Sequence, residues 1–485
     1  MVRIRISAVT MSGLMLLYAA GFIRNAVAYE ATWESLDSRP LPAWYDEAKF
    51  GVFIHWGVFS VPAFHTEWFW ERWQAKKIPE FVNFVKKSEK PGFAYPDYAH
   101  RFDALFYEPN DWASIFAKSG AQYVVLTSKH HEGFCNWDSR DVPATWDWNS
   151  MEVGPRRDLV GDLARAVKNT TSVQTNHRLR FGLYHSLFEW FNPMYLADLA
   201  ANHTTHTFVD TKTMPELYDL VKKYEPEILW SDGGWGPSTY WKSTEFLAWY
   251  ATNSTVKDTC VWNDRWGQDA DCKHGSFRNC KDKFRPDHLI DYKWENCFTI
   301  DMSSWGYSRV TKYEKYQTVK SLIDLLIETV AFGGNLLLNI GPASDGTIHP
   351  IFVDRLMGIG DWLSVNGEGI YGTKPWTVCQ NETAAHVFYT TKNDVLYAHF
   401  REWPKDNIIT LEQPIATDET KVKMLGLNST MTLKWQVVGP SKESRREEES
   451  AMALSGIQVQ LPPLTPAKIP CQHAWVLAFT NLGNI

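Results

Sequence analysis

The sequence predicts an α/β protein in which parallel strands form a (β/α)8-like barrel, followed by an antiparallel β domain. Short apolar strands alternate with amphipathic helices between residues 50 and 364, a pattern that joins parallel strands through helical crossovers. Polar residues gather where these strands end, as they do at the mouth of a barrel. The 485 residues also suit a barrel, of about 250 residues or more, with an appended domain. We therefore predict a closed barrel rather than an open sheet.

The predicted elements follow one another in a regular order. Strands are expected at residues 50–56, 123–128, 179–184, 261–264 and 335–340 and within 226–236, and helices at 110–119, 158–168, 214–224, 321–330 and 352–364. Helix 110–119 has Asn110 as its predicted N-cap and Gly120 after its end. Pro215 lies in the first turn of helix 214–224, and Gly333 and Gly334 end helix 321–330.

The stretch PEILWSDGGWG, residues 226–236, is the centre of the predicted site. Alternation places Ile228, Trp230 and Asp232 on one face of the strand and Leu229 on the other. Asp232 then lies where a parallel strand ends, the usual position of catalytic residues in an α/β barrel. Two glycines follow it and leave room for a ligand to approach the carboxylate. Taken alone, the stretch is equally compatible with an Asp that caps a turn or the next helix.

Histidines and a glutamate follow the first two predicted strands. His55 shares a strand face with Phe53, and a structural role for this His is an equal alternative. Glu67 lies among aromatic residues in the next loop, where burial of its charge requires a partner or a ligand. His130 and His131 are adjacent, so both can serve one site only if the chain has already left the regular strand. Their spacing is not that of a zinc-protease helix, and no metal site is predicted.

The residues after 372 are predicted to form a second, all-β domain. Segments 386–390 and 395–400, joined through Lys392, Asn393 and Asp394, have the pattern of an antiparallel hairpin. Further short strands are expected at 432–438, 457–461 and 475–479. The predicted domains are therefore a catalytic barrel at residues 29–372 and a C-terminal domain at residues 373–485, the second without evident catalytic residues.

The N-terminus has the pattern of a secretory signal peptide over residues 1–28. Arg3 and Arg5 precede an apolar run at residues 6–23, and Ala26 and Ala28 form a small-residue cleavage pattern. An uncleaved anchor is the alternative, because the run is close to membrane-spanning length. The mature chain would begin near Tyr29, has no later run long enough to cross a bilayer, and is expected to be soluble.

Sequons and cysteines are consistent with a secretory protein. Five sequons are candidate glycosylation sites; they begin at Asn169, Asn202, Asn253, Asn381 and Asn428. The seven cysteines permit disulfides, and their odd number leaves at least one free or paired between chains. Cys272 and Cys280 are close enough in sequence to close a small loop, whereas the full set is too widely spread for a zinc site.

The composition argues against nucleic acid as a partner and favours carbohydrate. A net charge of −7 provides no basic surface for nucleic acid. Tryptophan faces stack on the apolar C–H faces of sugars, so the 24 Trp residues suggest a carbohydrate ligand, although most of them should lie in the core.

The polar residues at the strand ends form a set that is typical of a glycosidase. The set comprises His55, Glu67, His130, His131, Tyr184, Asp232 and Arg265, with Asp282 and Glu295 as further carboxylates. In a glycosidase one carboxylate attacks the anomeric carbon while another protonates the leaving oxygen. The histidines supply donors and acceptors for the sugar hydroxyls.

Eight motifs resemble those of the retaining alpha-L-fucosidases of the lysosomal or secreted type. They are FGVFIHWG (50–57), EWFW (67–70), SKHHEGF (128–134), GLYHS (182–186), LWSDGGW (229–235), NDRWG (263–267), KWENC (293–297) and GGNLLLNIGP (333–342). Each motif is weak alone, but the combination is specific. The resemblance extends over about residues 44–376, and the C-terminal domain matches in kind. It implies a TIM barrel with a C-terminal β-sandwich, and hydrolysis of terminal α-linked L-fucose from glycoproteins or glycolipids by double displacement.

The resemblance also implies roles for individual residues. Asp232 matches the nucleophile, and the sugar-binding set is matched by His55, Glu67, Trp68, His130, His131, Tyr184, Trp230 and Arg265. The acid/base lies after NDRWG, where relatives differ, and Asp282 in CKDKF competes with Glu295 in KWENC. We favour Asp282, because its loop can lean over the mouth, whereas Glu295 lies within or beside a later strand. Cys297 is expected near the catalytic residues.

The remaining expectations concern partners and rival functions. No metal or organic cofactor is implied, and the expected partner is a fucosylated glycan rather than nucleic acid or, after signal cleavage, a membrane. A homo-oligomer is expected by analogy with relatives, in the lysosome or outside the cell. A barrel glycosidase for another sugar and a secreted fucose-binding protein without catalysis are the alternatives. The intact Asp232 with two candidate acids argues against the second.

Overall fold

The computed structural model describes residues 28–428, 430–438 and 456–485. The predicted signal peptide therefore lies outside the described residues, apart from Ala28. None of the helices within the described residues is long and apolar enough to cross a membrane.

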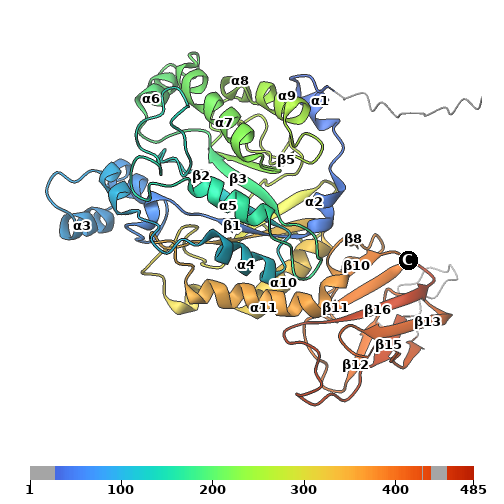
Figure 1. Ribbon diagram of the computed structural model, residues 1–485. Coiled ribbons are helices and arrows are strands. Elements are labelled where there is room, and N and C mark those ends of the chain that lie inside the picture. The colour runs from blue at the N-terminus through green and yellow to red at the C-terminus, as the bar shows by residue number, and fades with distance from the viewer. Residues whose placement is uncertain (1–27, 429, 439–455) are drawn as a thin grey trace, which may run out of the picture.

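A parallel sheet of seven strands lies at the centre of the molecule (Figure 1). Its strands are β1 (Phe50–Ile54), β2 (Tyr123–Lys129), β3 (Arg180–Ser186), β4 (Ile228–Asp232), β5 (Val261–Trp262), β6 (Trp294–Thr299) and β7 (Gly334–Ile340), in the spatial order β5-β4-β3-β2-β1-β7-β6. Every pair in this order is parallel. The predicted α/β barrel architecture is confirmed, with β6 as a strand that the apolar pattern did not predict.

The opening between the two edge strands is bridged by an irregular segment, residues 276–279. The Ser276 amide donates to the Trp262 carbonyl of β5 at 3.0 Å. The Arg278 amide donates to the Lys293 carbonyl at 2.9 Å, and the Glu295 amide of β6 donates to the Arg278 carbonyl at 3.0 Å. Backbone hydrogen bonds therefore continue around the ring through a segment that replaces a regular eighth strand.

Helices cover the outer surface of the sheet, as the crossovers of parallel strands require. They include α4 (Pro109–Ser119), α5 (Leu159–Lys168), α7 (Met214–Tyr224), α9 (Ser243–Asn253), α10 (Val319–Ala331) and α11 (Pro350–Asn366). Shorter helices lie beside the loops, namely α1 (Trp33–Asp37), α2 (Ala43–Ala48), α3 (Pro79–Ser88), α6 (Pro193–Ala200) and α8 (Ser238–Trp241). The predicted N-cap of α4 was wrong, because Pro109 starts the helix and Glu108 is the N-cap. A proline suits the first helical position, where its missing N–H has no helical partner.

Alternate residues of each strand enter two different cores. On β1, Val52 and Ile54 pack in the layer between sheet and helices. Phe53 points the other way, into the barrel interior, and joins Ile228 and Trp230 of β4. The predicted alternation of side chains on β1 and β4 is confirmed. The last inward-facing side chains of these strands therefore lie at the carboxyl-terminal mouth of the barrel.

Two antiparallel sheets follow the barrel. The larger contains β8 (Lys374–Pro375), β9 (Asn381–Glu382), β10 (Val387–Lys392), β11 (Val395–Phe400), β13 (Ala416–Met424) and β16 (Trp475–Leu482). The smaller contains β12 (Ile408–Leu411), β14 (Trp435–Val438) and β15 (Gly456–Gln460). The facing sides of the two sheets share one apolar cluster, which includes Leu396 and Phe479 from one and Ile409 and Val459 from the other. This packing is that of a β-sandwich.

The hairpin β10–β11 forms as predicted, with Lys392 paired to Val395 across its turn. Both turn residues, Asn393 and Asp394, have positive φ, as a two-residue hairpin turn requires.

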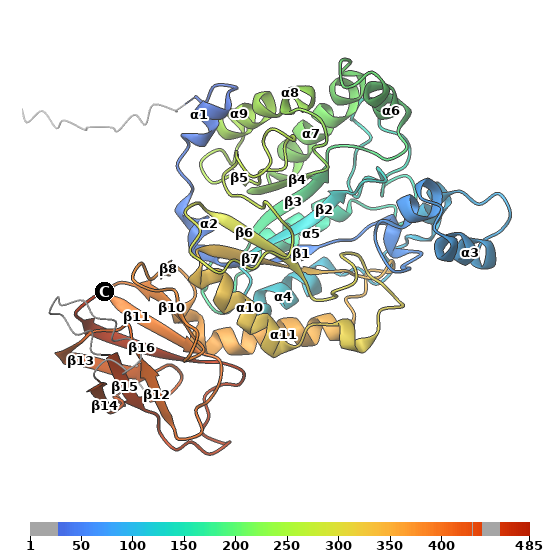
Figure 2. The same cartoon turned by 180° about the vertical axis from the view of Figure 1, so that it is seen from behind.

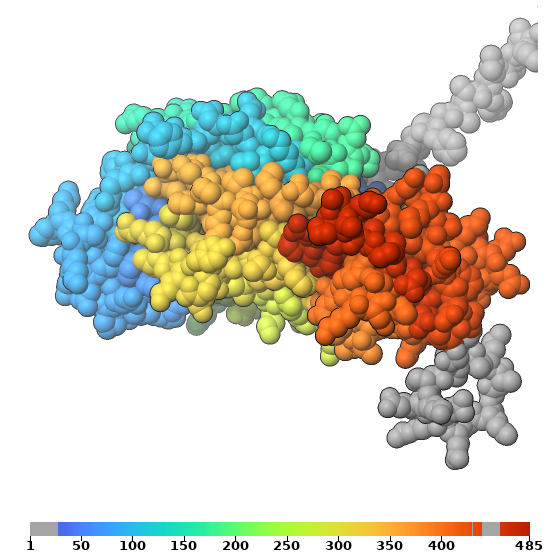
Figure 3. All heavy atoms as spheres, turned by 90° about the horizontal axis from the view of Figure 1, so that it is seen from below, coloured from blue at the N-terminus to red at the C-terminus, as the bar shows by residue number. Residues whose placement is uncertain are grey.

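The sandwich packs against the barrel helices rather than hanging from a linker. Phe388 of β10 meets Phe332, at the end of α10, with ring centroids 6.0 Å apart. The indole N–H of Trp362 on α11 donates to the Ala474 carbonyl at 2.9 Å. Figures 2 and 3 show the sandwich at one end of an elongated molecule, beside α10 and α11. It therefore lies away from the strand ends where polar residues gather.

Candidate active site

A cavity of about 150 Å³ opens at the carboxyl ends of the strands. Its lining brings together Phe53, His55, Glu67, Trp68, His130, His131, Tyr184, Trp230, Asp232, Gly233, Trp235, Arg265, Asp282, Cys297 and Trp305. Every sequence-predicted site residue except Glu295 is in this set. Pockets for drug-sized ligands measure roughly 300–1,000 Å³, so this cavity suits one sugar ring.

Asp232 is the last residue of β4 and points into the cavity, with its side chain 24% exposed. Tyr184 Oη on β3 donates to Asp232 Oδ2 at 2.8 Å, and Arg265 Nη1 lies 3.3 Å from Oδ1. Gly233 has φ 69°, and a Cβ there would lie 2.3 Å from the Phe188 ring. The glycine therefore lets the chain turn sharply away just after the carboxylate, which stays fixed and accessible.

Arg265 joins two carboxylates in the cavity. Its Nη1 faces Asp232, while its Nη2 bonds to Asp282 Oδ1 and to Asn279 Oδ1. Asp282 is 41% exposed and comes from the segment between β5 and β6. Burial acts to lower the pKa of Arg265, but the Asp282 and Asp232 charges outweigh it and raise this pKa well above its usual value. One permanent guanidinium cation thus holds both acids at the same mouth.

Glu295 does not line the cavity. It lies on β6 inside the barrel, 1% exposed, and its carboxylate is enclosed by three donors. Tyr45 Oη and Tyr123 Oη donate to Oε2 at 2.8 and 2.5 Å, and Trp230 Nε1 donates to Oε1 at 2.7 Å. Trp230 lines the cavity above it. The geometry gives Glu295 a supporting position beneath the Trp230 ring.

Replacing Glu295 by Gln should change how stability depends on pH. Burial raises the pKa of Glu295 from 4.5 to about 7, against the effect of its hydrogen bonds. The folded state therefore binds this proton more tightly, and the group's contribution to stability falls as pH rises from about 4.5 to about 7. The free energy of unfolding, wild type minus variant, should drop over this window by up to about 3 kcal/mol.

Denaturant unfolding at several pH values measures this difference. The matched control is Glu419→Gln, because Glu419 is exposed on β13 and its difference should stay flat. A wild-type minus Glu295→Gln difference that is constant from acid to neutral pH would contradict the prediction.

Two histidines present ring nitrogens with free lone pairs to the cavity. His55 Nδ1 lies 2.7 Å from Asn339 Oδ1, an acceptor, so Nδ1 carries the hydrogen. His131 Nδ1 lies 2.7 Å from Ser186 Oγ, whose own hydroxyl donates to the Phe188 carbonyl, so this Nδ1 is also the donor. In both residues Nε2 is left as an acceptor for a ligand hydroxyl.

The environment keeps both rings neutral. Burial, with the neighbouring His130, lowers the pKa of His55 to about 4, and the same two causes lower the pKa of His131 well below its usual value. Neutral imidazoles accept hydrogen bonds from sugar hydroxyls, whereas imidazolium ions do not.

Glu67 is bound by the loop after β6. Its Oε2 accepts from Ser304 Oγ at 3.1 Å and from the amides of Trp305 and Gly306 at 3.0 and 3.3 Å. Burial of this charge is thus compensated by protein donors, one of the two outcomes expected from the sequence, and the second carboxylate oxygen is left for a ligand.

Sequence reasoning missed two aromatic walls of the cavity. Trp305 packs on His55 with centroids 5.2 Å apart, and Trp235 lies 4.5 Å from Phe188 and is 46% exposed. Trp235 ends the LWSDGGW motif, so its position directly after the paired glycines was an available signal. Trp305 follows β6, which the apolar pattern did not reveal.

Comparison with known proteins decides the family. The family model for alpha-L-fucosidase matches residues 17–368, and the model for the alpha-L-fucosidase C-terminal domain matches residues 380–480. The chain belongs to the alpha-L-fucosidase family. The resemblance found in the sequence is confirmed, and with it the expectation that the chain is an enzyme, a glycoside hydrolase.

Full-length relatives support this family assignment. The tissue alpha-L-fucosidase of Rattus norvegicus is 48% identical over 475 residues, covering 97% of both chains. That of Homo sapiens is 49% identical over 473 residues, covering 97% of this chain and 96% of its own. The crystal structure of Thermotoga maritima alpha-fucosidase in complex with fucose has a TM-score of 0.76 and 32% identity, covering 93% of this chain and 100% of its own.

A buried ion network lies behind the cavity of this fucosidase-family chain. Lys129 Nζ, at the end of β2, lies 2.9 Å from Glu189 Oε1 and 2.6 Å from Glu216 Oε2. Lys212 Nζ bonds to the same two glutamates at 3.3 and 3.5 Å. All four side chains are at most 2% exposed. Glu189 is followed in the chain by Trp190, whose amide donates to the His131 carbonyl at 2.8 Å. The network therefore supports the loop that carries His131.

Replacing Lys129 by Met should destabilise the fold by about 3–5 kcal/mol, because it leaves buried carboxylates undercompensated. Denaturant unfolding measures the loss. The control is Lys320→Met, which removes an exposed i,i+4 pair with Asp324 and should cost about 0.5 kcal/mol or less. A similar small loss in both variants would contradict the prediction.

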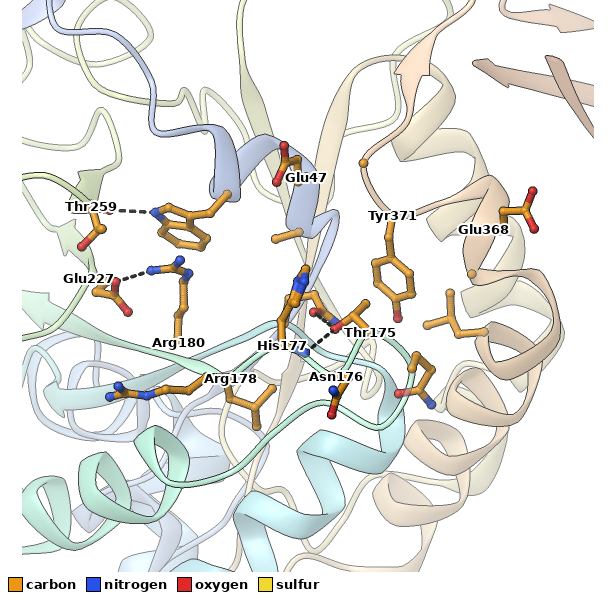
Figure 4. Close-up of a pocket in the computed structure, with 18 of the residues that line it drawn as sticks. Glu47, Thr175, Asn176, His177, Arg178, Arg180, Glu227, Thr259, Glu368 and Tyr371 are labelled. Atoms are coloured by element: carbon orange, nitrogen blue, oxygen red, sulfur yellow. Dashed lines mark hydrogen bonds and ion pairs between the residues drawn. The ribbon is translucent and has the colours of Figure 1, made fainter. Parts of the chain in front are cut away.

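A wider cavity of about 1420 Å³ lies at the opposite end of the strands (Figure 4). Two ion pairs lie within its lining, Lys168 with Glu225 and Arg180 with Glu227. Arg180 pairs with Glu227 and covers the Trp44 ring at 4.3 Å, and Trp44 Nε1 donates to the Thr259 carbonyl at 2.9 Å. In a barrel this end supports stability rather than chemistry, so we assign the active site to the smaller cavity.

Proposed function

We propose that this protein is a retaining alpha-L-fucosidase that cleaves terminal α-linked L-fucose through a covalent fucosyl-enzyme. The observation that carries the proposal is the pairing of Asp232 and Asp282 with one guanidinium, that of Arg265, at the mouth of the barrel. Retaining glycosidases need two carboxyl groups on opposite sides of one glycosidic bond, about 5–5.5 Å apart. Side chains that share one guanidinium are close enough to meet this need after small movements.

In the first step, Asp232 attacks the anomeric carbon of fucose and the bond to the glycosidic oxygen breaks. Asp282 donates its proton to that oxygen, so the leaving group departs as a neutral alcohol. The hydrogen bond from Tyr184 and the contact with Arg265 hold the Asp232 carboxylate in position for attack. Asp282 must turn from Arg265 toward the glycosidic oxygen, and its 41% exposure leaves room for this turn.

In the second step, the roles of the two carboxyl groups are exchanged. The Asp282 carboxylate takes a proton from water, and the resulting hydroxyl attacks the anomeric carbon of the fucosyl-enzyme. The ester bond to Asp232 breaks, and fucose leaves with its original configuration. Glu295, the alternative acid/base, has both oxygens engaged by buried donors, which supports Asp282 in this role.

Recognition of the sugar is assigned to His55, Glu67, Trp68, His130, His131, Tyr184, Trp230 and Arg265, which all line the cavity. The acceptor Nε2 atoms of His55 and His131 and the free oxygen of Glu67 suit the hydroxyl groups of one sugar. The aromatic rings suit its apolar faces and a methyl substituent. These residues need neither a metal nor an organic cofactor for the two steps.

We further propose fucosylated glycoproteins or glycolipids as substrates, and the lysosome or the extracellular space as the location. The five sequons support this proposal, because Asn169, Asn202, Asn253 and Asn428 are exposed and Asn381 is half-buried. The relatives named tissue and plasma alpha-L-fucosidase point the same way. The domain limits 29–372 and 373–485 and a homo-oligomer remain part of the proposal.

Hydrolysis of an aryl α-L-fucoside, followed by NMR, tests the function. α-L-Fucose should appear first and convert slowly to the anomeric mixture. Release of β-L-fucose first would refute retention. Faster cleavage of the aryl α-galactoside would favour a glycosidase for another sugar, and binding of fucose without turnover would favour an inactive fucose-binding protein.

A further inference from the structure

The segment that carries Asp282 has no regular secondary structure, yet it is tied to the barrel at several points. It connects β5 to β6 through residues 263–293, which contain neither helix nor strand. Long connections of this kind are usually either functional or disordered. The fixed points of this one therefore decide how precisely it can present an acid to the substrate.

The first fixed point is a buried carboxylate. Asp264, which is fully buried, is the second residue after β5 and precedes Arg265. Its Oδ2 accepts from the Cys272 amide and its Oδ1 from the Asn279 amide, both at 3.0 Å. Each oxygen thus holds one side of the same small loop.

The second fixed point is the disulfide between Cys272 and Cys280. It closes the loop whose two sides Asp264 holds. Gly275, at the tip of this loop, has φ 147°, and a Cβ there would lie 2.7 Å from the Asn263 carbonyl oxygen. The loop therefore folds back closely over the chain that leaves β5.

Asn279 and Cys280 connect this anchored loop to Asp282. Asn279 Oδ1 bonds to Arg265, and its Nδ2 donates to the Glu295 carbonyl at 2.8 Å. Beyond Asp282, the Lys283 amide donates to the Cys297 carbonyl of β6 at 2.9 Å. Only Lys281 and Asp282 lie between the disulfide and this next anchor, so the position of the acid is set by its neighbours.

We propose that Asp264 and the Cys272–Cys280 disulfide are positioning groups that hold the Asp282 carboxyl in reach of the glycosidic oxygen. The inference rests on the proposed role of Asp282 as the acid/base. It predicts a specific defect: loss of either group should impair proton donation to the leaving group while leaving the attack by Asp232 largely intact.

The test compares two substrates that differ in their need for an acid. Phenyl α-L-fucoside has a poor leaving group and needs proton donation, whereas dinitrophenyl α-L-fucoside does not. In Asp264→Asn the amide cannot accept from both backbone N–H groups, and in the double variant Cys272→Ser/Cys280→Ser the loop is open. Each variant should lose at least about 10-fold in kcat/KM on the phenyl substrate and less than about 3-fold on the dinitrophenyl substrate.

The matched control is Asp269→Asn, on the same segment. Asp269 also accepts from a backbone amide, that of Ser238 at 2.6 Å, but it does not hold the disulfide loop. Its ratio of the two kcat/KM values should equal that of the wild type. The ratio of the two kcat/KM values of one variant does not depend on the concentration of active enzyme, so partial unfolding does not imitate the effect.

The outcomes are distinguishable. Equal losses on both substrates in Asp264→Asn, or no loss on either, would overturn the inference and reduce these groups to structural supports. If the double Ser variant does not fold, Asp264→Asn decides alone, because it retains the disulfide. Asp282→Asn is assayed in parallel: if it lacks the leaving-group dependence, the proposed acid/base is wrong. If it has that dependence and the loop variants do not, only the positioning role fails.

Discussion

Replacing Asp232 by Gly should lower the hydrolysis of aryl α-L-fucosides by at least about 10⁴-fold, comparable to the loss when other covalent enzymes lack their nucleophile. The carboxylate is the only group of β4 that reaches the cavity with both Tyr184 and Arg265 bonded to it. Removing it leaves no atom to form the covalent intermediate. Steady-state kinetics on the dinitrophenyl substrate measure the loss.

A small anion should restore part of this activity. The deleted side chain leaves space beneath the anomeric carbon, so azide can enter there and attack from the side that Asp232 occupied. The product should be β-fucosyl azide, with inverted configuration, since only one displacement takes place. NMR of the product distinguishes it from the retained α-azide.

The matched control is Asp394→Gly in the β10–β11 turn. Asp394 has φ 59°, which glycine adopts without strain, and it lies in the C-terminal sandwich. This variant should keep wild-type activity and melting temperature. Undiminished hydrolysis by Asp232→Gly, with its fold intact, would remove Asp232 from the proposed mechanism.

The alternating strands were predictable because successive side chains of a strand point to opposite faces. This alternation placed Trp230 and Asp232 on the inner face of β4, where the structure has them. β6 escaped prediction because its polar residues serve both faces: Glu295 bonds to barrel-interior tyrosines, and Asn296 Nδ2 donates to Thr329 Oγ1 on α10 at 3.0 Å. A strand with polar groups on both sides shows no apolar periodicity.

The site was predictable where motifs lie at strand ends and unpredictable where the chain is irregular. His130 and His131 both reach the cavity because β2 ends at Lys129, which is the condition that the sequence analysis required. The closure of the ring by residues 276–279 depends on hydrogen bonds from backbone groups, which any residue type supplies. Sequence patterns carry no signal for such contacts.

The sequence alone could not decide whether Asp282 or Glu295 is the acid/base. Asp282 and Glu295 are thirteen positions apart, and only the fold shows that one bonds to Arg265 in the cavity while the other is enclosed below Trp230. The difference is one of exposure, 41% for the side chain of Asp282 against 1% for Glu295. A proton donor must reach the substrate, so exposure to the cavity favours Asp282.

Replacing Asp282 by Asn should separate substrates by their leaving groups. Hydrolysis of phenyl α-L-fucoside should fall by about 10²–10⁴-fold, the usual contribution of general acid catalysis. Dinitrophenyl α-L-fucoside should form the fucosyl-enzyme at nearly the wild-type rate, since its leaving group needs no proton. The intermediate should then accumulate, because water lacks a general base, and pre-steady-state kinetics should show a burst of dinitrophenolate.

Azide should accelerate the second step in this variant, since an anionic nucleophile needs no base. The product should be α-fucosyl azide, with retained configuration, because Asp232 still performs the first displacement. The two Asp variants are thus expected to give opposite azide anomers from the same substrate. Glu295→Gln is the matched carboxylate control, and it should keep the wild-type dependence on the leaving group. If Glu295→Gln gives the retained azide and Asp282→Asn does not, the acid/base is Glu295, and its buried carboxyl must move during turnover.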